Sequence, residues 1–268
     1  MAFRIVIGDV TIGIQGQDFA YIFSVGMGGM ESLYKDGKEW LYRAPRPAFW
    51  RAATDNDRGN GFVFRSAVWS AADRFVRCVK VTARMDEQEI SMPPAPENNK
   101  YNGDETCDRF EISYTYETPT VPVTEVTVSY LVESDGRIHV QVDYLGKQGL
   151  PELPVLGLRF LMPTAAEGYT YEGLSGETYP DRMAGGIPGT YRVQGLPVTP
   201  YLVPQDCGMH MQTKWVEITR KTSLDNTDHA KSESKLRFVA EEGENFAFTC
   251  LPYTAQELEN ALHQEELP

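Results

Sequence analysis

The stretches that decide the fold class are Glu125-Val-Thr-Val-Ser-Tyr-Leu-Val132 and Arg137-Ile-His-Val-Gln-Val-Asp-Tyr144. Apolar and polar side chains alternate along both, and a period of two is that of a strand with one buried face. Between them lies Glu133-Ser-Asp-Gly136, a short polar segment ending in glycine that suits a tight turn. Together they predict an antiparallel β-hairpin and therefore an antiparallel sheet.

Strand signals continue on both sides of this hairpin. Turn residues such as Asp36-Gly37 separate short runs rich in apolar and β-branched side chains. We predict strands at residues 4–7, 10–14, 19–25, 30–34, 39–42, 76–85, 153–162, 210–219, 235–240 and 246–250. The strands at 210–219 and 235–240 are expected to pair, and residues 163–207 read as loops.

Two segments favour a short helix. Ala67, Ala71 and Phe75 stand at helical spacing within residues 64–75. Thr254-Ala-Gln-Glu257 is a capping box, which predicts a helix that runs to about residue 263. Because no repeat or linker divides the chain, we expect residues 1–268 to form a single all-β domain.

Charge and composition restrict the partners. The net charge is −13, so the field of the protein repels phosphate backbones and anionic membranes, and neither is expected as a partner. The N-terminal residues predict no secretory signal, which favours a cytoplasmic protein. The scattered cysteines are typical of reduced thiols and predict no zinc site. These cysteines are Cys78, Cys107, Cys207 and Cys250.

The most specific string is Phe49-Trp-Arg-Ala-Ala-Thr-Asp-Asn-Asp-Arg-Gly59. It resembles the signature of the C-terminal domain of glycoside hydrolase family 2 β-galactosidases, Phe-Trp-Arg-Ala-Pro-Thr-Asp-Asn-Asp-x-Gly, with Ala53 in place of proline. The residues of this signature that we expect to act in structure or assembly are Trp50, Arg51, Thr54, Asp55, Asn56 and Asp57.

Three further segments resemble the same family. Residues 171–182 resemble a Gly-x-Gly-Pro-x-Glu-Asn-Tyr-x-Asp-Arg loop without its Gly-Pro and Asn, and residues 199–208 resemble a Tyr-x-x-Pro-x-Glu-x-Gly segment. Residues 251–263 resemble the Tyr-Thr turn, short helix and histidine near the end of the domain. The loop retains Glu177, Tyr179, Asp181 and Arg182. These four residues have two interpretations, contact with sugar hydroxyls or a structural ion-pair network.

The resemblance is closest to the small subunit of two-chain β-galactosidases, and an excised domain of a single-chain enzyme stays open. It implies an antiparallel β super-sandwich, like that of galactose mutarotases, with one or two short helices. The family domain continues to an Asp-x-Trp motif that this chain lacks, so we expect the domain to be truncated at its C-terminal end.

The resemblance also implies how the chain acts. Retaining glycosidases need two carboxyls about 5–5.5 Å apart, and in this family both lie in a TIM-barrel domain. We therefore expect no catalytic residue, bound metal or cofactor in this chain, with any metal ions in a large catalytic partner. The complex would hydrolyse terminal β-D-galactosides such as lactose at a site that both chains line.

One loop is expected at the edge of that substrate site. The resemblance implies that it opens and closes, and its residues are Arg58, Gly59, Asn60 and Gly61. A calcium site at Asp55, Asn56 and Asp57 is the alternative, but the loop has few further oxygen donors, so turn capping and pairing with Arg51 or Arg58 are preferred.

Two other functions compete with the subunit interpretation. A freestanding carbohydrate-binding module would bind galactosides through aromatic platforms such as Trp50, although a core role is preferred for that ring. A mutarotase-like epimerase would depend on His139 or His210, but no mutarotase motif surrounds either histidine.

Overall fold

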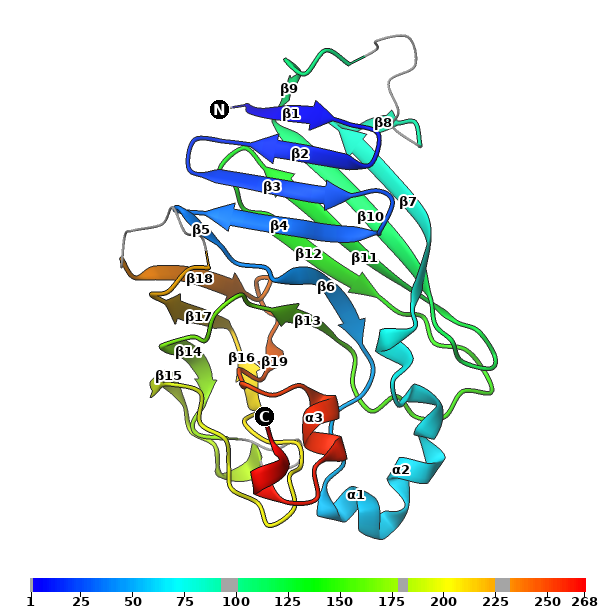
Figure 1. Ribbon diagram of the computed structural model, residues 1–268, viewed down its shortest axis with the longest axis vertical. Coiled ribbons are helices and arrows are strands. Elements are labelled where there is room, and N and C mark those ends of the chain that lie inside the picture. The colour runs from blue at the N-terminus through cyan, green and yellow to red at the C-terminus, as the bar shows by residue number, and fades with distance from the viewer. Residues whose placement is uncertain (1, 93–100, 178–182, 225–231) are drawn as a thin grey trace. The chain divides into compact units, whose positions relative to one another are not determined.

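The computed structural model describes residues 2–92, 101–177, 183–224 and 232–268. The chain divides into two compact units (Figure 1). Unit 1 comprises Met1–Trp50 and Arg65–Pro163, and unit 2 comprises Arg51–Phe64 and Thr164–Pro268. All strand pairs in both are antiparallel, which confirms the all-β prediction. The division into two compact units does not test the predicted single domain, which stays a prediction.

Unit 1 contains two large sheets. The first has the order β5-β4-β3-β2-β1-β9, and the second has the order β12-β11-β10-β7-β8. Strands of the first are β1 (Phe3–Ile7), β2 (Thr11–Gln15), β3 (Phe19–Ser24), β4 (Gly29–Lys35), β5 (Lys38–Glu39) and β9 (Thr106–Cys107). Strands of the second are β7 (Arg77–Met85), β8 (Gln88–Ile90), β10 (Arg109–Glu117), β11 (Glu125–Glu133) and β12 (Ile138–Asp143).

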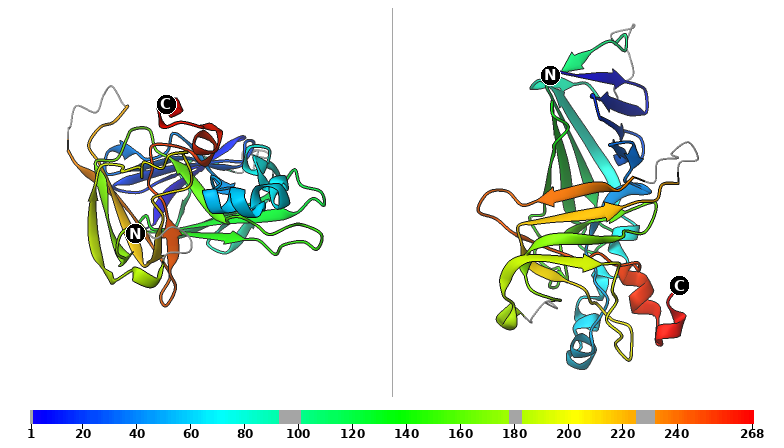
Figure 2. Two further views of the ribbon diagram at one scale, coloured as in Figure 1. Left: turned by 90° about the horizontal axis from the view of Figure 1, so that it is seen from below. Right: turned by 90° about the vertical axis from the view of Figure 1, so that its left-hand side faces the viewer.

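The two sheets of unit 1 form two layers around an aromatic core (Figure 2, right). The Phe23 ring of β3 lies 5.6 Å from Phe110 and 5.7 Å from Tyr130 of the opposite sheet, measured between ring centroids. The Tyr114 hydroxyl donates to the Gly29 carbonyl at 3.2 Å, so this phenol is satisfied although its ring is buried. Burial of each such side chain contributes about 1.5–3 kcal/mol.

The predicted hairpin is β11 and β12, and the Gly136 amide closes its turn by donating to the Glu133 carbonyl at 2.9 Å. Every second residue of β11 is buried, as the alternation predicts. No residue of β12 is buried, so the same alternation there marks an edge strand rather than a second core strand. A sequence period reports a face, but the neighbouring strands decide whether that face is covered.

The sequence missed β6 (Arg43–Ala48), which pairs with β13 (Gly157–Leu161) and with no other strand of the described residues. Its prolines, Pro45 and Pro47, argue against a strand, and they lack the N–H groups that a central strand needs. The pair accommodates them as an isolated two-stranded sheet with an irregular register.

The single helix predicted at 64–75 is wrong. Three short pieces replace it: α2 (Phe62–Arg65), η1 (Ala67–Trp69) and η2 (Ala72–Arg74). Ala71 interrupts the helix with a left-handed φ of 63°. The Ser66 hydroxyl and the Trp69 indole donate to the carbonyls of Glu152 and Pro151, and these contacts bend the segment away from a continuous helix.

Unit 2 is built on a four-stranded sheet with the order β15-β14-β17-β18. Its strands are β14 (Gly168–Leu174), β15 (Pro188–Gln194), β17 (Trp215–Arg220) and β18 (Ser234–Val239), and a smaller sheet pairs β16 (His210–Thr213) with β19 (Phe246–Phe248). Helical segments are α1 (Asp55–Asn60), η4 (Met183–Gly185), α3 (Ala255–Asn260) and η5 (Gln264–Glu266).

Unit 2 corrects two predictions and confirms two. The loops predicted at 163–207 contain β14 and β15, and residues 210–219 divide into β16 and β17, which lie in different sheets. The pairing of β17 with β18 and the capping box of α3 are confirmed. In the described part of the chain, no helix has the length and apolar character required to span a membrane.

Candidate functional site

From Arg51 on, the signature segment belongs to unit 2, and it forms a capped helix rather than the predicted loop. Thr54 is the N-cap of α1: its hydroxyl accepts from the Asp57 amide at 3.0 Å, and the Asp57 carboxylate accepts from the Thr54 amide at 3.0 Å. This reciprocal capping box satisfies N–H groups that have no partner at the first turn of a helix. From the sequence we expected the Asp and Asn side chains to cap a turn here, and the role of Thr54 as N-cap became visible only in the structure.

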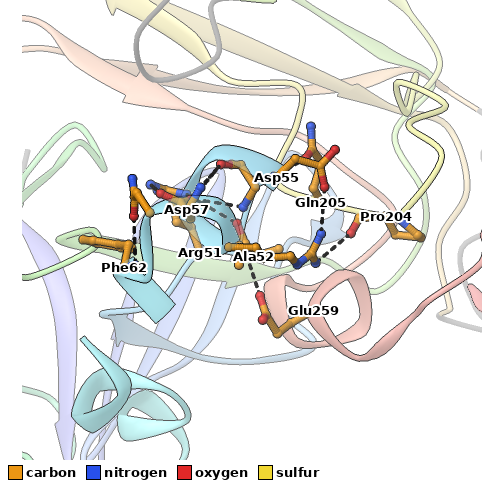
Figure 3. A network of polar contacts seen from close by, with 12 residues as sticks. Arg51, Ala52, Asp55, Asp57, Phe62, Pro204, Gln205 and Glu259 are labelled. Atoms are coloured by element: carbon orange, nitrogen blue, oxygen red, sulfur yellow. Dashed lines mark hydrogen bonds and ion pairs between the residues drawn. The ribbon is translucent and has the colours of Figure 1, made fainter. Parts of the chain in front are cut away.

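Arg51 and Asp57 form the central ion pair of this segment (Figure 3). Two guanidinium nitrogens donate to the two oxygens of the carboxylate at 2.6 and 3.2 Å, and both side chains are largely buried. Burial alone would raise the pKa of the Asp57 carboxyl, but hydrogen bonds from Arg51 and Thr54 outweigh it and hold that pKa below its ordinary value. The predicted pairing of Arg51 with this cluster is therefore present in its ionised form.

Three contacts attach α1 to distant parts of unit 2 (Figure 3). The Asp55 amide donates to the Gln205 side chain at 2.9 Å, and the Arg58 guanidinium donates to the Pro204 carbonyl at 3.3 Å. The Ala53 amide donates to the carboxylate of Glu259 on α3. Of these partners, only the segment around Gln205 was visible in the sequence, through its family resemblance, and Glu259 had no signal apart from the capping box of its helix.

The expected edge loop has a defined backbone. Arg58, Gly59 and Asn60 belong to α1, and Gly61 ends the helix with a left-handed φ of 73°. The Asn60 side chain accepts from the Phe62 amide at 2.8 Å, and the Arg51 guanidinium lies 5.6 Å from the Phe62 ring centroid. Gly59 is therefore helical rather than part of a loop, and the backbone changes conformation at Gly61; the expected opening and closing of these residues stays a prediction.

The segment next to α1 contains a buried acid, Asp206. This residue is 6% exposed, and its Oδ2 has no hydrogen-bond partner within the described residues. Burial raises the pKa of the Asp206 carboxyl to about 7; Arg51 opposes this effect, and the negative charges of Asp57 and Glu177 add to it. The sequence placed Asp206 at the acid position of the 199–208 resemblance but gave no reason to expect a neutral acid.

Of the four family residues expected within 171–182, Glu177 is the one that the structure describes. Its Oε2 accepts from the Thr199 hydroxyl, whereas its Oε1 is buried without a hydrogen-bond partner in the described chain. Tyr179, Asp181 and Arg182 lie outside the described residues. The choice between sugar contact and a structural network for these four residues therefore stays a prediction.

His210 is enclosed in the core of unit 2. Its Nδ1 lies 2.8 Å from the Gly176 carbonyl, and its Nε2 lies 2.8 Å from the Tyr169 hydroxyl. A carbonyl only accepts, so Nδ1 carries the proton and Nε2 accepts from Tyr169. Burial lowers the pKa of this imidazole, which keeps it neutral. His210 supports the backbone before Glu177, whereas His139 belongs to unit 1, so the pair predicted for a mutarotase lies in separate units.

Two other site predictions concern metal binding and sugar stacking. Within the described residues, no three His, Cys, Asp or Glu side chains group closely enough to hold a metal ion. Both Asp57 oxygens accept hydrogen bonds from Arg51 or Thr54, and Asp55 lies 3.4 Å from the Arg58 guanidinium, as the capping interpretation expects. Trp50 is buried in unit 1, which suits a core residue better than a sugar platform.

Comparisons with known proteins identify the family. A family described as beta galactosidase small chain matches residues 15–268. The chain is 58% identical over 264 residues to the β-galactosidase small subunit of Latilactobacillus sakei, which covers 98% of this chain and 83% of that protein. It is 31% identical over 266 residues to a β-galactosidase of Streptococcus thermophilus and 31% identical over 268 residues to the β-galactosidase BgaC of Bifidobacterium adolescentis. Each of these two alignments covers 98% of this chain but 23% of the relative, so the chain spans about a quarter of the longer proteins. The chain therefore belongs to the β-galactosidase small-chain family.

Proposed function

We propose that this chain is the non-catalytic small subunit of a glycoside hydrolase family 2 β-galactosidase of the two-chain type. The observation that carries the proposal is the contrast between two kinds of relative. One is a small subunit, of which the alignment covers 83%, and the others include the same segment within a β-galactosidase about four times as long as this chain. A segment that is covalently part of the enzyme in one protein and separate in another acts as a part that has to assemble. The partner is a large chain that carries the catalytic carboxyls.

The geometry of the signature segment supports an assembly role rather than a catalytic one. The guanidinium of Arg51 and the carboxylate of Asp57 are committed to each other, so neither is available to transfer protons or attack a sugar. The same contacts make α1 rigid, because its first turn is capped, Asp55 is attached to Gln205, and Ala53 just before the helix is attached to Glu259. A rigid element with satisfied polar groups is suited to position a surface.

The surface that we assign to the partner contains α1 and the residues that follow it. Asp55 is exposed on α1, and the side chains of Phe64 and Leu202 are 85% and 91% exposed. Exposed large apolar side chains next to charged ones are typical of the centre and rim of an interface. In the complex, Arg58, Gly59, Asn60 and Gly61 line the edge of the galactoside site, and the reaction is retaining hydrolysis of terminal β-D-galactosides such as lactose.

Reconstitution tests this function. The chain and the large chain of the same source are mixed, and hydrolysis of a chromogenic β-galactoside is measured, with each chain alone as a control. Activity that appears only in the mixture is the expected result. Activity of this chain alone would overturn the non-catalytic role, and galactoside binding by the isolated chain without any gain in activity on mixing would favour the carbohydrate-binding module.

A substitution in the shared surface separates assembly from folding. Phe64→Ser and Leu202→Ser replace exposed side chains, so they leave the core of the chain unchanged. We expect weaker association with the large chain and unchanged thermal unfolding of the isolated variants. Ile187→Ser is a matched control, because its side chain is also exposed in unit 2 but lies outside the proposed surface. Equal association of all three variants would remove this surface from the interface.

A further inference from the structure

The four consecutive residues Pro204 to Cys207 are all buried, although the segment has no regular secondary structure. Two of them hold the segment on α1, through the Pro204 carbonyl to Arg58 and the Gln205 side chain to the Asp55 amide. The third, Asp206, has a carboxyl oxygen that is buried without a hydrogen-bond partner in the described residues. The segment is therefore held on α1 by two hydrogen bonds, but it also buries the incompletely hydrogen-bonded carboxyl of Asp206.

The charges that surround Asp206 disfavour its ionised form. From the segment before α1 it faces Arg51, but that guanidinium already donates to both oxygens of Asp57. Asp57 on α1 and Glu177 after β14 present negative charge to it, and its own neighbour Cys207 is a buried neutral thiol. Within the described residues, three carboxyls thus share the guanidinium of Arg51. A further negative charge in this surrounding is unfavourable, because a buried charge needs a partner of opposite sign.

The cost of burying a negative charge on Asp206 can be avoided in two ways, by protonating the carboxyl or by opening the segment. A protonated carboxyl carries no charge and has an O–H donor. When the segment opens, water solvates the carboxylate. Since Asp206 follows Pro204 and Gln205 directly, exposing its side chain pulls on both attachments to α1.

We propose that residues 204–207 are a proton-operated latch, in which a neutral Asp206 keeps the segment closed on α1 and loss of its proton favours the open segment. The sign follows from linkage. Because the closed form holds its proton more tightly than the open form, closure is strongest at acidic pH and weakens as the pH rises. The weakening begins near the ordinary Asp value of 3.8 and ends near pH 7, where the closed form also ionises. Over this window the opening constant rises about tenfold per pH unit, or about a thousandfold in all.

Hydrogen exchange of the full chain tests the latch. Amide exchange in the peptide that covers residues 204–207 is measured from pH 4.5 to 8.5, and exchange times are corrected for the intrinsic effect of pH. In the wild-type chain we expect the corrected rate to rise with pH up to about 7 and then to level off. In Asp206→Asn, which keeps the neutral amide at every pH, we expect a flat profile. Asp9→Asn removes an exposed carboxylate from unit 1 and should follow the wild type.

The test needs a correction for a second titrating residue and a second measurement that does not depend on the variant. Burial lowers the pKa of His210, so acid weakens unit 2 through that residue with the opposite trend. For this reason the quantity compared at each pH is the ratio of the wild-type exchange rate to the Asp206→Asn exchange rate. If Asp206→Asn does not fold, the latch is tested instead by ¹³C NMR, which measures the titration of each aspartate in wild-type chain labelled at the aspartate carboxyls. One aspartate that titrates near neutral pH supports the latch, whereas complete ionisation of all aspartates by pH 5, or a flat wild-type exchange profile, overturns it.

The latch is a property of this chain alone, so it stands or falls separately from the proposed function. Where both hold, the small chain should bind the large chain with a pH dependence that Asp206→Asn abolishes, because the latch holds α1, and α1 belongs to the proposed surface. Loss of that dependence in the complex, with the exchange profile of the isolated chain intact, would contradict the proposed surface and leave the latch standing.

Discussion

The Arg51–Asp57 pair gives the most direct prediction, because it combines burial with two-point geometry. Arg51→Ala would leave the largely buried Asp57 carboxylate near Asp206 without its guanidinium. Removing one partner of a buried pair costs about 3–5 kcal/mol. The Thr54 amide and hydroxyl still donate to this carboxylate, so we place the loss in free energy of unfolding near the lower end, at about 3 kcal/mol.

Asp57→Ala removes the same pair and also half of the capping box. We therefore expect a loss of about 4 kcal/mol, the pair plus about 1 kcal/mol for the cap. In the double variant Arg51→Ala/Asp57→Ala neither member of this pair is left without its partner, so the loss should fall below the sum of the single losses. We expect a coupling energy of about 2 kcal/mol, which corresponds to about thirtyfold in the unfolding equilibrium.

A double-mutant cycle by urea unfolding measures this coupling, with far-UV circular dichroism as the signal. The matched control is Arg77–Glu117 of unit 1, whose closest nitrogen–oxygen distance is also 2.6 Å but whose arginine is 76% exposed. Exposed pairs couple by about 0.2–1 kcal/mol. A coupling of Arg51 with Asp57 that is no larger than that of the control would refute the argument that burial and two-point geometry make this pair a structural anchor.

Three further predictions concern the same unit. Gly59→Ala should stabilise the chain by about 0.5–1 kcal/mol in thermal unfolding, since a helical Cβ there meets no atom, whereas Gly61→Ala should cost about 1 kcal/mol because φ is 73°. If Gly59→Ala destabilises, the helical assignment of this position fails. Thr254→Ala should lower stability by about 1 kcal/mol by removing the cap of α3, and an unchanged urea midpoint would contradict a role for that cap. His210 has a lowered pKa in the fold, so its contribution to stability should fall as the pH drops below its ordinary value of 6.5; a pH series of urea midpoints should show this in the wild type and not in His210→Gln, and parallel curves would refute it.

Strands with a covered face were predictable from the sequence, and segments held by distant contacts were not. The alternation of β11 and the glycine turn after it are local patterns, and both appear in the structure. In contrast, β14 and β15 were read as loops, because their glycines and prolines have low strand propensity. Pairing of β14 with strands on both sides overrides that propensity.

The helix α1 shows the same limit at the candidate site. Its sequence, Asp-Asn-Asp-Arg-Gly-Asn, consists mainly of weak helix formers, so we predicted a turn. What makes it a helix is a local capping box together with Gln205 and Glu259, which are 150 and 206 residues away from their hydrogen-bond partners in the chain. Local capping could be predicted from the sequence, whereas the distant hydrogen-bond partners could not.

The sequence by itself determined the all-β class, the capping box of α3 and the family, because periodicity, caps and signature strings are properties of residues close together in the chain. Only the tertiary structure decided that Arg51 is committed to Asp57, that His210 is a buried neutral imidazole and that Asp206 lacks a counter-ion in the described residues. The charge state of a buried group depends on its distance from water and on every charge around it, and those charges come from segments that the fold alone brings together.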